Sequence, residues 1–392
     1  MNLSIESAHG RLLAGASVCA VAAAALTLWP STDASAEADP ANLRLERSDV
    51  DPDLVAALQA ELGAVPVSEV ADSANRTAQS CTAPVKNHDQ SFCWDRGDSG
   101  VEYWMPQGVT GTGDASDSGD VDGREIMLNA WYDNNSGRDM GVRVSFVDMA
   151  GGATPSYRHT LLVEPVWDGD QPSFQRVNSH AGGMVWYGDH LYVNETYNGM
   201  RVFDMSSVMK VDVGDGAAIG RQPDGTYQAH NYLYVIPQVA RYVPSSAGGE
   251  PALRYSQTAL DRTSSPHSLV VSEYGNPGGD TRVARFDLDE ASHRVAEDDD
   301  GVARADWAQT VGIRSMQGAA AVDGTYYIQR SNGDSKTGDV FVWNPGNTAV
   351  PHNGALPVGP EDMTYWPQRD QLWSQSEYPG KRYVYATKPG SW

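Results

Sequence analysis

From about residue 100 onward, a unit of three short β-type runs joined by tight turns recurs along the chain. In the clearest copy, His180 opens the first run, Gly188-Asp189 form the first turn, and Asn198-Gly199 form the turn before a run that ends at Asp204. Runs of this length, punctuated by Gly, Asp, Asn and Pro, are typical of antiparallel strands. The repeat therefore predicts an all-β fold.

The repeated unit can be followed through the rest of the chain. Clear copies lie at 180–204, 317–343 and 361–386, looser copies at 107–148 and 256–287, and a fourth run follows some of them, at 157–164 and 231–238. Four antiparallel strands repeated in tandem are typical of β-propeller blades. The copies thus predict a β-propeller of five blades with four antiparallel strands each. Alternatives are six blades, with an extra one inside 207–252, or two unrelated β-sandwiches.

The last copy ends at Trp392, just after its third strand. Its fourth strand must therefore come from elsewhere, and we expect it from the segment 91–104. A propeller closed by an N-terminal strand in this way leaves no exposed sheet edge.

The N-terminal 36 residues have the features of a signal peptide. An Ala-rich apolar run at 12–29 follows Arg11 and precedes the small-residue triplet Ala34-Ser35-Ala36. This pattern predicts cleavage after Ala36 and a secreted, extracellular protein. An uncleaved membrane anchor is the alternative, because the run approaches the length needed to cross a bilayer.

Residues 37–80 are predicted to form a flexible leader, with the propeller domain at 81–392. One helix is expected in the leader near 52–62, where Asp51 can cap the first turn, Pro52 suits the first helical position and Gly63 can end the helix. Docking of the leader on the body and its removal like a pro-segment are the two alternatives.

Cys81 and Cys93 are the cysteines that remain after the predicted cleavage. An even pair in an exported protein normally oxidises, so we expect a disulfide between them. Two free thiols are the alternative. No cysteine or histidine spacing typical of zinc accompanies the pair.

The charge of the chain limits its partners. With 28 Lys and Arg against 51 Asp and Glu, the net charge is −23. Binding to nucleic-acid phosphates needs a basic surface, so this acidic protein is not expected to bind nucleic acid. Binding to anionic lipid is disfavoured for the same reason.

The residues that open the repeated copies are expected to converge at the central channel, because the first strand of each blade begins there. They share hydrogen-bonding side chains: Gln107, His180, Gln257, Gln317, Glu361 and Asp362. Such a set suits a polar ligand at the channel mouth. A channel that holds only water, or a metal bound by His180 and Glu361, are the alternatives.

Catalytic motifs are scarce in the sequence. It contains no GxSxG, HExxH or Walker motif. A glycosidase needs two carboxylates beside the scissile bond. The channel offers Glu361 and Asp362, and Glu195, Glu273 and Glu377 at the ends of second strands are further candidates.

Two acidic loops resemble calcium-binding loops in composition. They contain Asp114, Asp117, Asp120 and Asp122 in one case and residues 297–300 in the other. Neither has the ligand spacing of an EF-hand, so solvated loops without a metal are the main expectation and calcium is the alternative.

The repeated copies resemble secreted β-propeller proteins in general, a group that includes five-bladed lectins and glycosidases. The WD dipeptide and the Kelch double glycine are not sustained across the copies, so no family's binding residues can be transferred. We predict a recognition module for a polar extracellular ligand, a carbohydrate or an extracellular protein, with a glycoside hydrolase or lyase as the alternative. The rings expected near the channel mouth are Trp131, Trp186, Tyr187, Trp366 and Trp373. Several of them alternate with apolar residues inside strands, so burial in the core is the favoured alternative for each individual tryptophan.

Overall fold

The structure is a computed structural model that describes residues 39–135, 139–275 and 281–392. The predicted signal peptide, residues 1–36, lies outside the described residues. Strands predominate in the described part, and its helices are short, which confirms the predicted all-β fold. None of the described helices combines the length and the apolar character needed to cross a membrane.

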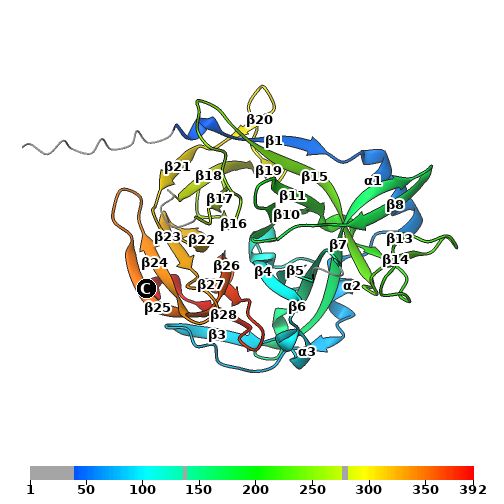
Figure 1. The fold of residues 1–392 in the computed structure, drawn as a ribbon, viewed down its shortest axis with the longest axis horizontal. Helices are drawn as coiled ribbons and strands as arrows, with labels where there is room; N and C mark the ends of the chain where they lie inside the picture. The colour runs from blue at the N-terminus through cyan, green and yellow to red at the C-terminus, as the bar shows by residue number, and fades with distance from the viewer. Residues whose placement is uncertain (1–38, 136–138, 276–280) are drawn as a thin grey trace, which may run out of the picture. The chain divides into compact units, whose positions relative to one another are not determined.

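Most strands belong to groups of four antiparallel neighbours (Figure 1). The first group is β4 (Trp104–Gly111), β5 (Ile126–Asp133), β6 (Val142–Asp148) and β7 (Ser156–Asp168). The second is β9 (Met184–Tyr187), β10 (His190–Glu195), β11 (Gly199–Asp204) and β15 (Tyr234–Ser246). The third is β16 (Gln257–Asp261), β17 (Ser268–Ser272), β18 (Arg282–Asp289) and β21 (Trp307–Thr310). The fourth is β22 (Met316–Val322), β23 (Thr325–Arg330), β24 (Thr337–Trp343) and β25 (Val350–Val358). The last is β26 (Pro360–Trp366), β27 (Gln371–Ser376), β28 (Tyr383–Thr387) and β3 (His88–Cys93).

Turn chemistry fixes the register within these groups. Between β22 and β23, Asp323 and Gly324 have φ angles of 48° and 76°. Two left-handed residues form the type I′ turn that best joins antiparallel strands. The turn pairs Val322 directly with Thr325 and sets the register of the hairpin.

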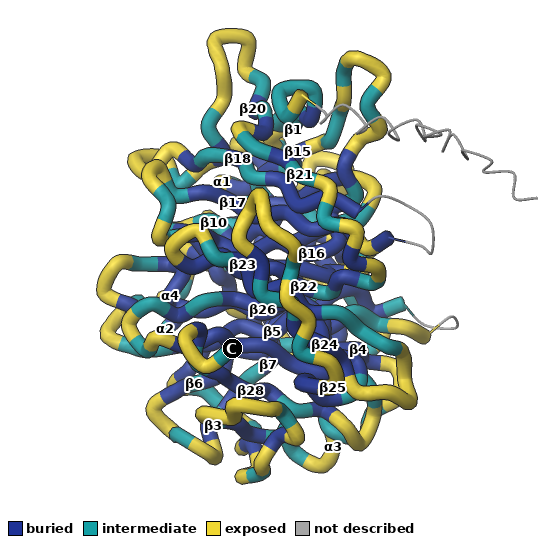
Figure 2. Tube along the Cα trace, turned by 90° about the vertical axis from the view of Figure 1, so that its left-hand side faces the viewer, coloured by how far each residue is buried: buried dark blue, intermediate teal, exposed yellow. Residues whose placement is uncertain are grey.

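The first strands of the groups meet around one centre. β4 contacts β9, β9 contacts β16, β16 contacts β22, β22 contacts β26, and β26 contacts β4 again (Figure 1). Every residue of β4 and β16 is buried, and Figure 2 shows the buried segments inside exposed loops. Four-stranded antiparallel units that meet in this way make up a β-propeller.

The sheet layout departs from a regular propeller between the first two groups. β7 and β15 run parallel and pair over a few residues, which joins both groups into one sheet. Seven short strands extend the sheets or form small hairpins: β2 (Arg76–Thr77), β8 (Gln171–Arg176), β12 (Met209–Lys210), β13 (Ile219–Arg221), β14 (Tyr227–Ala229), β19 (Arg294–Val295) and β20 (Val302–Arg304).

The segment predicted to be a flexible leader is built into the body instead. β1 (Leu43–Asp49) pairs with both β15 and β20. It is followed by α1 (Pro52–Leu62) and α2 (Val67–Asp72), and α1 covers the range predicted for the helix. The leader is ordered because α1 and α2 bury apolar side chains against the sheets, among them Leu58 and Val70.

An N-terminal strand completes the last group. β3 pairs antiparallel with β28. The expected segment was 91–104, whereas the strand lies at His88–Cys93. It ends earlier because Asp95 caps the short helix α3 (Arg96–Gly100), its side chain accepting a hydrogen bond from the Asp98 amide. A further short helix, α4 (Thr112–Ala115), follows β4.

The predicted disulfide between Cys81 and Cys93 is present, with 5.8 Å between the Cα atoms. It ties the end of β3 to the segment before it. Replacing both cysteines by serine is expected to lower the free energy of unfolding by about 3 kcal/mol, because the unfolded chain regains the entropy of a short loop. Urea unfolding of both proteins measures this difference, and an unchanged midpoint would contradict it.

Candidate functional site

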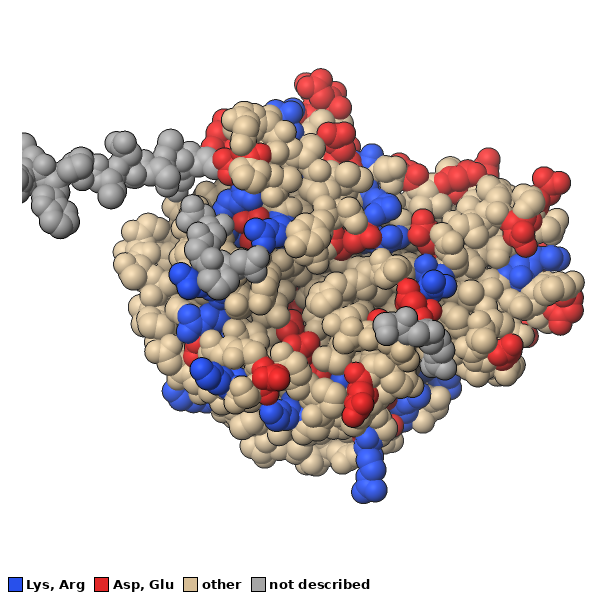
Figure 3. Space-filling model, in the orientation of Figure 1, with Lys and Arg blue, Asp and Glu red and all other residues tan. Residues whose placement is uncertain are grey.

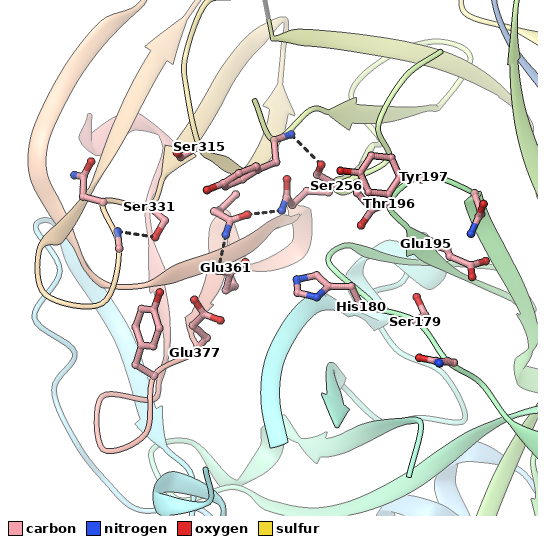
Figure 4. A pocket seen from close by; sticks show the side chains of 18 residues that line it. Ser179, His180, Glu195, Thr196, Tyr197, Ser256, Ser315, Ser331, Glu361 and Glu377 are labelled. Carbon is pink, nitrogen blue, oxygen red and sulfur yellow. Dashed lines mark hydrogen bonds between the residues drawn. The ribbon is translucent and has the colours of Figure 1, made fainter. Parts of the chain in front are cut away.

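A cavity of about 920 Å³ opens where the first strands begin and the second strands end (Figure 4). Its lining is almost entirely polar or aromatic. The lining residues are Asn178, Ser179, His180, Glu195, Thr196, Tyr197, Asn198, Ser256, Gln257, Tyr274, Ser315, Gln317, Ser331, Asn332, Gly333, Glu361, Glu377 and Tyr378.

Four of the residues predicted for the channel mouth belong to one hydrogen-bonded chain. Gln257, Gln317 and Glu361 line the cavity, whereas Gln107 does not line it and contacts the lining residue Glu377. Gln257 Nε2 donates to Gln317 Oε1 at 2.7 Å, and Gln317 Nε2 donates to Glu361 Oε1 at 2.7 Å. Gln107 Nε2 donates to Glu377 Oε2 at 3.1 Å. We name Gln107, Gln257, Gln317, Glu361 and Glu377 the floor cluster.

The carboxyl groups of Glu361 and Glu377 lie next to each other where this chain ends and act directly on each other's pKa. Burial, followed by the charge of Glu377, raises the pKa of Glu361 well above its usual value. Burial also raises the pKa of Glu377. Two carboxyl groups in contact do not both ionise readily, so the pair holds a shared proton to higher pH than separate glutamates would.

His180 reaches the cavity from the loop before β9. Gly183 lies where that loop crosses β16, and a Cβ there would stand 2.3 Å from the amide nitrogen of Thr258, so glycine is required. The His180 ring lies against Tyr132, with 4.4 Å between ring centroids. The surrounding protein desolvates the imidazole and lowers its pKa, which favours the neutral form.

Asp362 does not line the cavity, although it is adjacent to Glu361. Its side chain is fully buried, and Oδ2 accepts hydrogen bonds from the backbone amides of Val109 at 2.8 Å and Met184 at 3.2 Å. Asp362 therefore connects β26 to β4 and β9, and we leave it out of the candidate ligand contacts.

The tryptophans and the tyrosine expected near the channel mouth belong to the core. The alternative of core burial holds for these rings, and they offer no platform at the channel mouth: all five are at most 2% exposed, namely Trp131, Trp186, Tyr187, Trp366 and Trp373. Each lies in a strand whose side chains alternate between faces, and both faces of these strands are covered by neighbouring sheets.

Three other tyrosines provide the aromatic rings at the cavity, where the tryptophans and Tyr187 had been expected. Tyr197, Tyr274 and Tyr378 line the cavity, and Tyr197 is 75% exposed. The sequence analysis missed them. Each follows a second strand and comes one or two residues after a glutamate, as in Glu273-Tyr274 and Glu377-Tyr378. That repeated pairing is the signal that locates them.

The other two glutamates considered as catalytic are held in ion pairs. Glu195 pairs with Arg201 at 3.1 Å and with Arg241 at 2.5 Å. Glu273 pairs with Arg282 at 2.8 Å. These pairs link the ends of second strands to neighbouring strands, so among these candidates Glu377 is the one in contact with Glu361.

In the first acidic loop considered for calcium, Asp114 and Asp117 already contact other side chains of the protein. Asp114 accepts hydrogen bonds from the hydroxyls of Thr110 and Thr364. Burial raises its pKa to about 7. Arg262 pairs with Asp117.

In the other acidic loop Asp298 pairs with Arg304. The described residues contain no group of three His, Cys, Asp or Glu placed to hold a metal ion.

No family model matches the sequence, and no curated protein matches it either. Among solved structures, the β-propeller domain of Cps50 (Swd1) from Myceliophteria thermophila is 10% identical with a TM-score of 0.37, covering 78% of this chain and 99% of that chain. Glutaminyl cyclase from Myxococcus xanthus is 11% identical with a TM-score of 0.34, covering 80% and 94%. A GH43_1 enzyme from Xanthomonas citri is 11% identical with a TM-score of 0.33, covering 84% and 92%. Similarity at these TM-scores carries no inference about the fold or activity of this chain.

Proposed function

We propose that the chain is a five-bladed β-propeller that recognises a hydroxyl-rich polar ligand, of the carbohydrate class, in the central cavity. The blade count is supported by the four-stranded groups that begin with β4, β9, β16, β22 and β26 and by the contacts among these strands. Residues 39–80 then form an N-terminal extension docked on the outside of the ring.

The floor cluster together with the three cavity tyrosines is the observation that carries this proposal. Amide groups both donate and accept hydrogen bonds, as sugar hydroxyls do. Tyrosine faces cover the apolar side of a sugar ring, and their hydroxyls supply further hydrogen bonds. A cavity of about 920 Å³ has the size of a small-ligand site.

A glycoside hydrolase is the second candidate, and the raised pKa of Glu361 favours it, because a general acid must keep its proton near neutral pH. Glycosidases, however, hold their two carboxyl groups about 5–9.5 Å apart so that the scissile bond lies between them. Glu361 and Glu377 lie next to each other. Recognition without cleavage therefore fits the floor cluster better.

We also propose that the protein is exported. The disulfide between Cys81 and Cys93 is typical of proteins that mature in an oxidising compartment. The ligand would then be an extracellular small molecule, a glycan or a glycan-bearing protein, and the acidic charge argues against a nucleic-acid partner.

A glycan array with the mature protein tests the proposal. We expect binding to a subset of saccharides and a loss of about tenfold or more in affinity for Gln317→Ala, because this change removes the donor to Glu361 Oε1 and the acceptor of Gln257 Nε2. Gln175→Ala on the exposed face of β8 is the matched control and should bind as the unmodified protein does.

The outcomes separate the two candidate functions. No binding to any saccharide, or binding untouched by Gln317→Ala, would contradict the proposed site. Turnover of a bound glycan that is lost in Glu361→Ala would favour the hydrolase instead.

A further inference from the structure

The floor cluster has surplus hydrogen-bond acceptors. Gln257 Oε1, in the cavity lining, is buried and receives no hydrogen bond from the described residues, since its amide nitrogen is turned toward Gln317. Glu361 Oε2 is buried as well and receives no hydrogen bond from any described amide, guanidinium or alcohol group. These residues are 1–3% exposed. Buried acceptors of this kind need a donor, which here a ligand can supply.

The acidic side chains of the cavity lining are only partly balanced by basic ones. Among the described residues that line it there is no Lys or Arg, while Glu195, Glu361 and Glu377 are present. Glu195 pairs with Arg201 and Arg241, so Glu361 and Glu377 are the lining carboxyl groups without a salt bridge in the described part of the chain. Figure 3 shows acidic atoms in the hollow at the middle of this face. The nearby Arg382 is directed to the backbone, donating to the carbonyl oxygens of Glu377 and Asp98 at 2.7 Å. A cationic ligand is thus favoured over an anionic one.

Aromatic rings border the same space. Tyr197, labelled in Figure 4, and Tyr274 are 75% and 40% exposed, and Tyr378 lines the cavity next to Glu377 in sequence. The faces of tyrosine rings attract cations. Carboxyl groups at the floor and tyrosines at the rim are together suited to an organic cation.

We propose that the ligand carries a primary ammonium group that docks on the Glu361–Glu377 pair, which makes an amino sugar the preferred ligand. This inference rests on the proposed carbohydrate recognition and adds the chemical class of the sugar. An ammonium group has three donors and no acceptor. It can therefore donate to both glutamates and to the amide oxygen of Gln257 at once, which a neutral hydroxyl cannot do.

The charge of the pair makes this binding sensitive to pH. An ammonium group is bound more tightly by a carboxylate than by a protonated carboxyl group. The groups that act electrostatically on Glu361 and Glu377 are Asp362, Arg382, Tyr132, Tyr378 and Tyr385. None of these tyrosines ionises near neutral pH, because the pKa of each is raised. Affinity is expected to fall as the pH falls through the range in which the pair takes up its second proton.

Calorimetric titration of the full mature protein with a glucosamine trisaccharide, and with its N-acetylated counterpart, tests the inference. At about pH 7 we expect the amino form to bind roughly 10- to 100-fold more tightly, the range of one charge-assisted hydrogen bond. Glu377→Gln should remove this preference. Glu61→Gln, the same change on the outside of α1, is the control and should keep it.

Each result decides the inference. Equal affinity for the two trisaccharides overturns the ammonium site and leaves carbohydrate recognition standing. No binding of the amino form also overturns the ammonium site, and only the absence of binding to every saccharide of the glycan array overturns carbohydrate recognition as well. The protein is first titrated with calcium chloride alone. If calcium binds and prevents the amino sugar from binding, the glutamate pair is a calcium site and the ammonium site is overturned. If Glu377→Gln does not fold, the unmodified protein is titrated at about pH 7 and at about pH 4 instead. A preference for the amino form that is the same at both pH values contradicts the role of the glutamate pair.

Discussion

A chain that begins at Tyr103 is expected to aggregate rather than fold to a stable monomer. It lacks β3, so β28 would present an unpaired edge to solvent and to other molecules. It also lacks Phe92 and Trp94, which are fully buried. Loss of two such side chains costs on the order of 6–10 kcal/mol, comparable with the whole stability of a typical domain.

A chain that begins at Ser80 is the matched control, since it lacks the same leader but keeps Cys81 and β3. Size-exclusion chromatography and thermal unfolding compare the two. If both chains are equally monomeric and melt alike, β3 is not required for closure.

Asp98→Ala is expected to destabilise the protein by about 3–5 kcal/mol, because it leaves a buried guanidinium without its counter-ion. Asp98 is 5% exposed and pairs with Arg143 at 2.8 Å and with Arg76 at 3.2 Å. It also accepts a hydrogen bond from Tyr157 at 2.7 Å. Urea unfolding measures the loss, which a change below about 1 kcal/mol would contradict.

The control for this change is Asp49→Ala, which removes an ion pair with Arg47 from the surface. The Asp49 side chain is 61% exposed. Exposed ion pairs contribute at most about 1 kcal/mol, so this variant should unfold close to the unmodified protein.

The pH dependence of the Asp98 effect follows from its pKa. Hydrogen bonding to His159 and the charge of Arg143 lower the pKa of Asp98 against the opposing effect of burial. A carboxyl group whose pKa is lowered by folding stabilises the folded state at every pH above its pKa in the unfolded chain, which is about 3.9 for Asp. This stabilisation is lost as the pH falls below that value. The difference between the unmodified protein and Asp98→Asn should therefore shrink below about pH 4.

The repeated strands could be predicted because their signals are local. The Asp323-Gly324 turn and the alternation on either side of it determine the hairpin of β22 and β23 without reference to the rest of the chain. The convergence of Gln107, Gln257, Gln317 and Glu361 follows from the repeat, since equivalent positions of successive units lie at the same end of the sheets. Glu377 was considered only as one of three equivalent carboxylates.

The remaining features depend on contacts between distant residues. β1 pairs with a strand about 200 residues later, where Leu43 lies opposite Ser246. The sequence of β1 alone does not indicate which strand it pairs with. Trp131 and Trp373 could not be placed by residue type, because a tryptophan in a strand suits a sheet interface as well as a ligand platform. The shared proton of Glu361 and Glu377 depends on burial, which only the assembled sheets provide.

The pairing of β3 with β28 has a consequence for the resistance of the protein to proteolysis. β3 precedes the first strand of the ring in sequence and completes the last group, so the two ends of the ring are held in a single sheet. Cleavage requires a locally opened backbone, and β28, which pairs with β27 on one edge and with β3 on the other, can open only after one of these neighbours separates. The lifetime of the C-terminal strand under proteolysis would then depend on the opening of a larger unit rather than on local fraying.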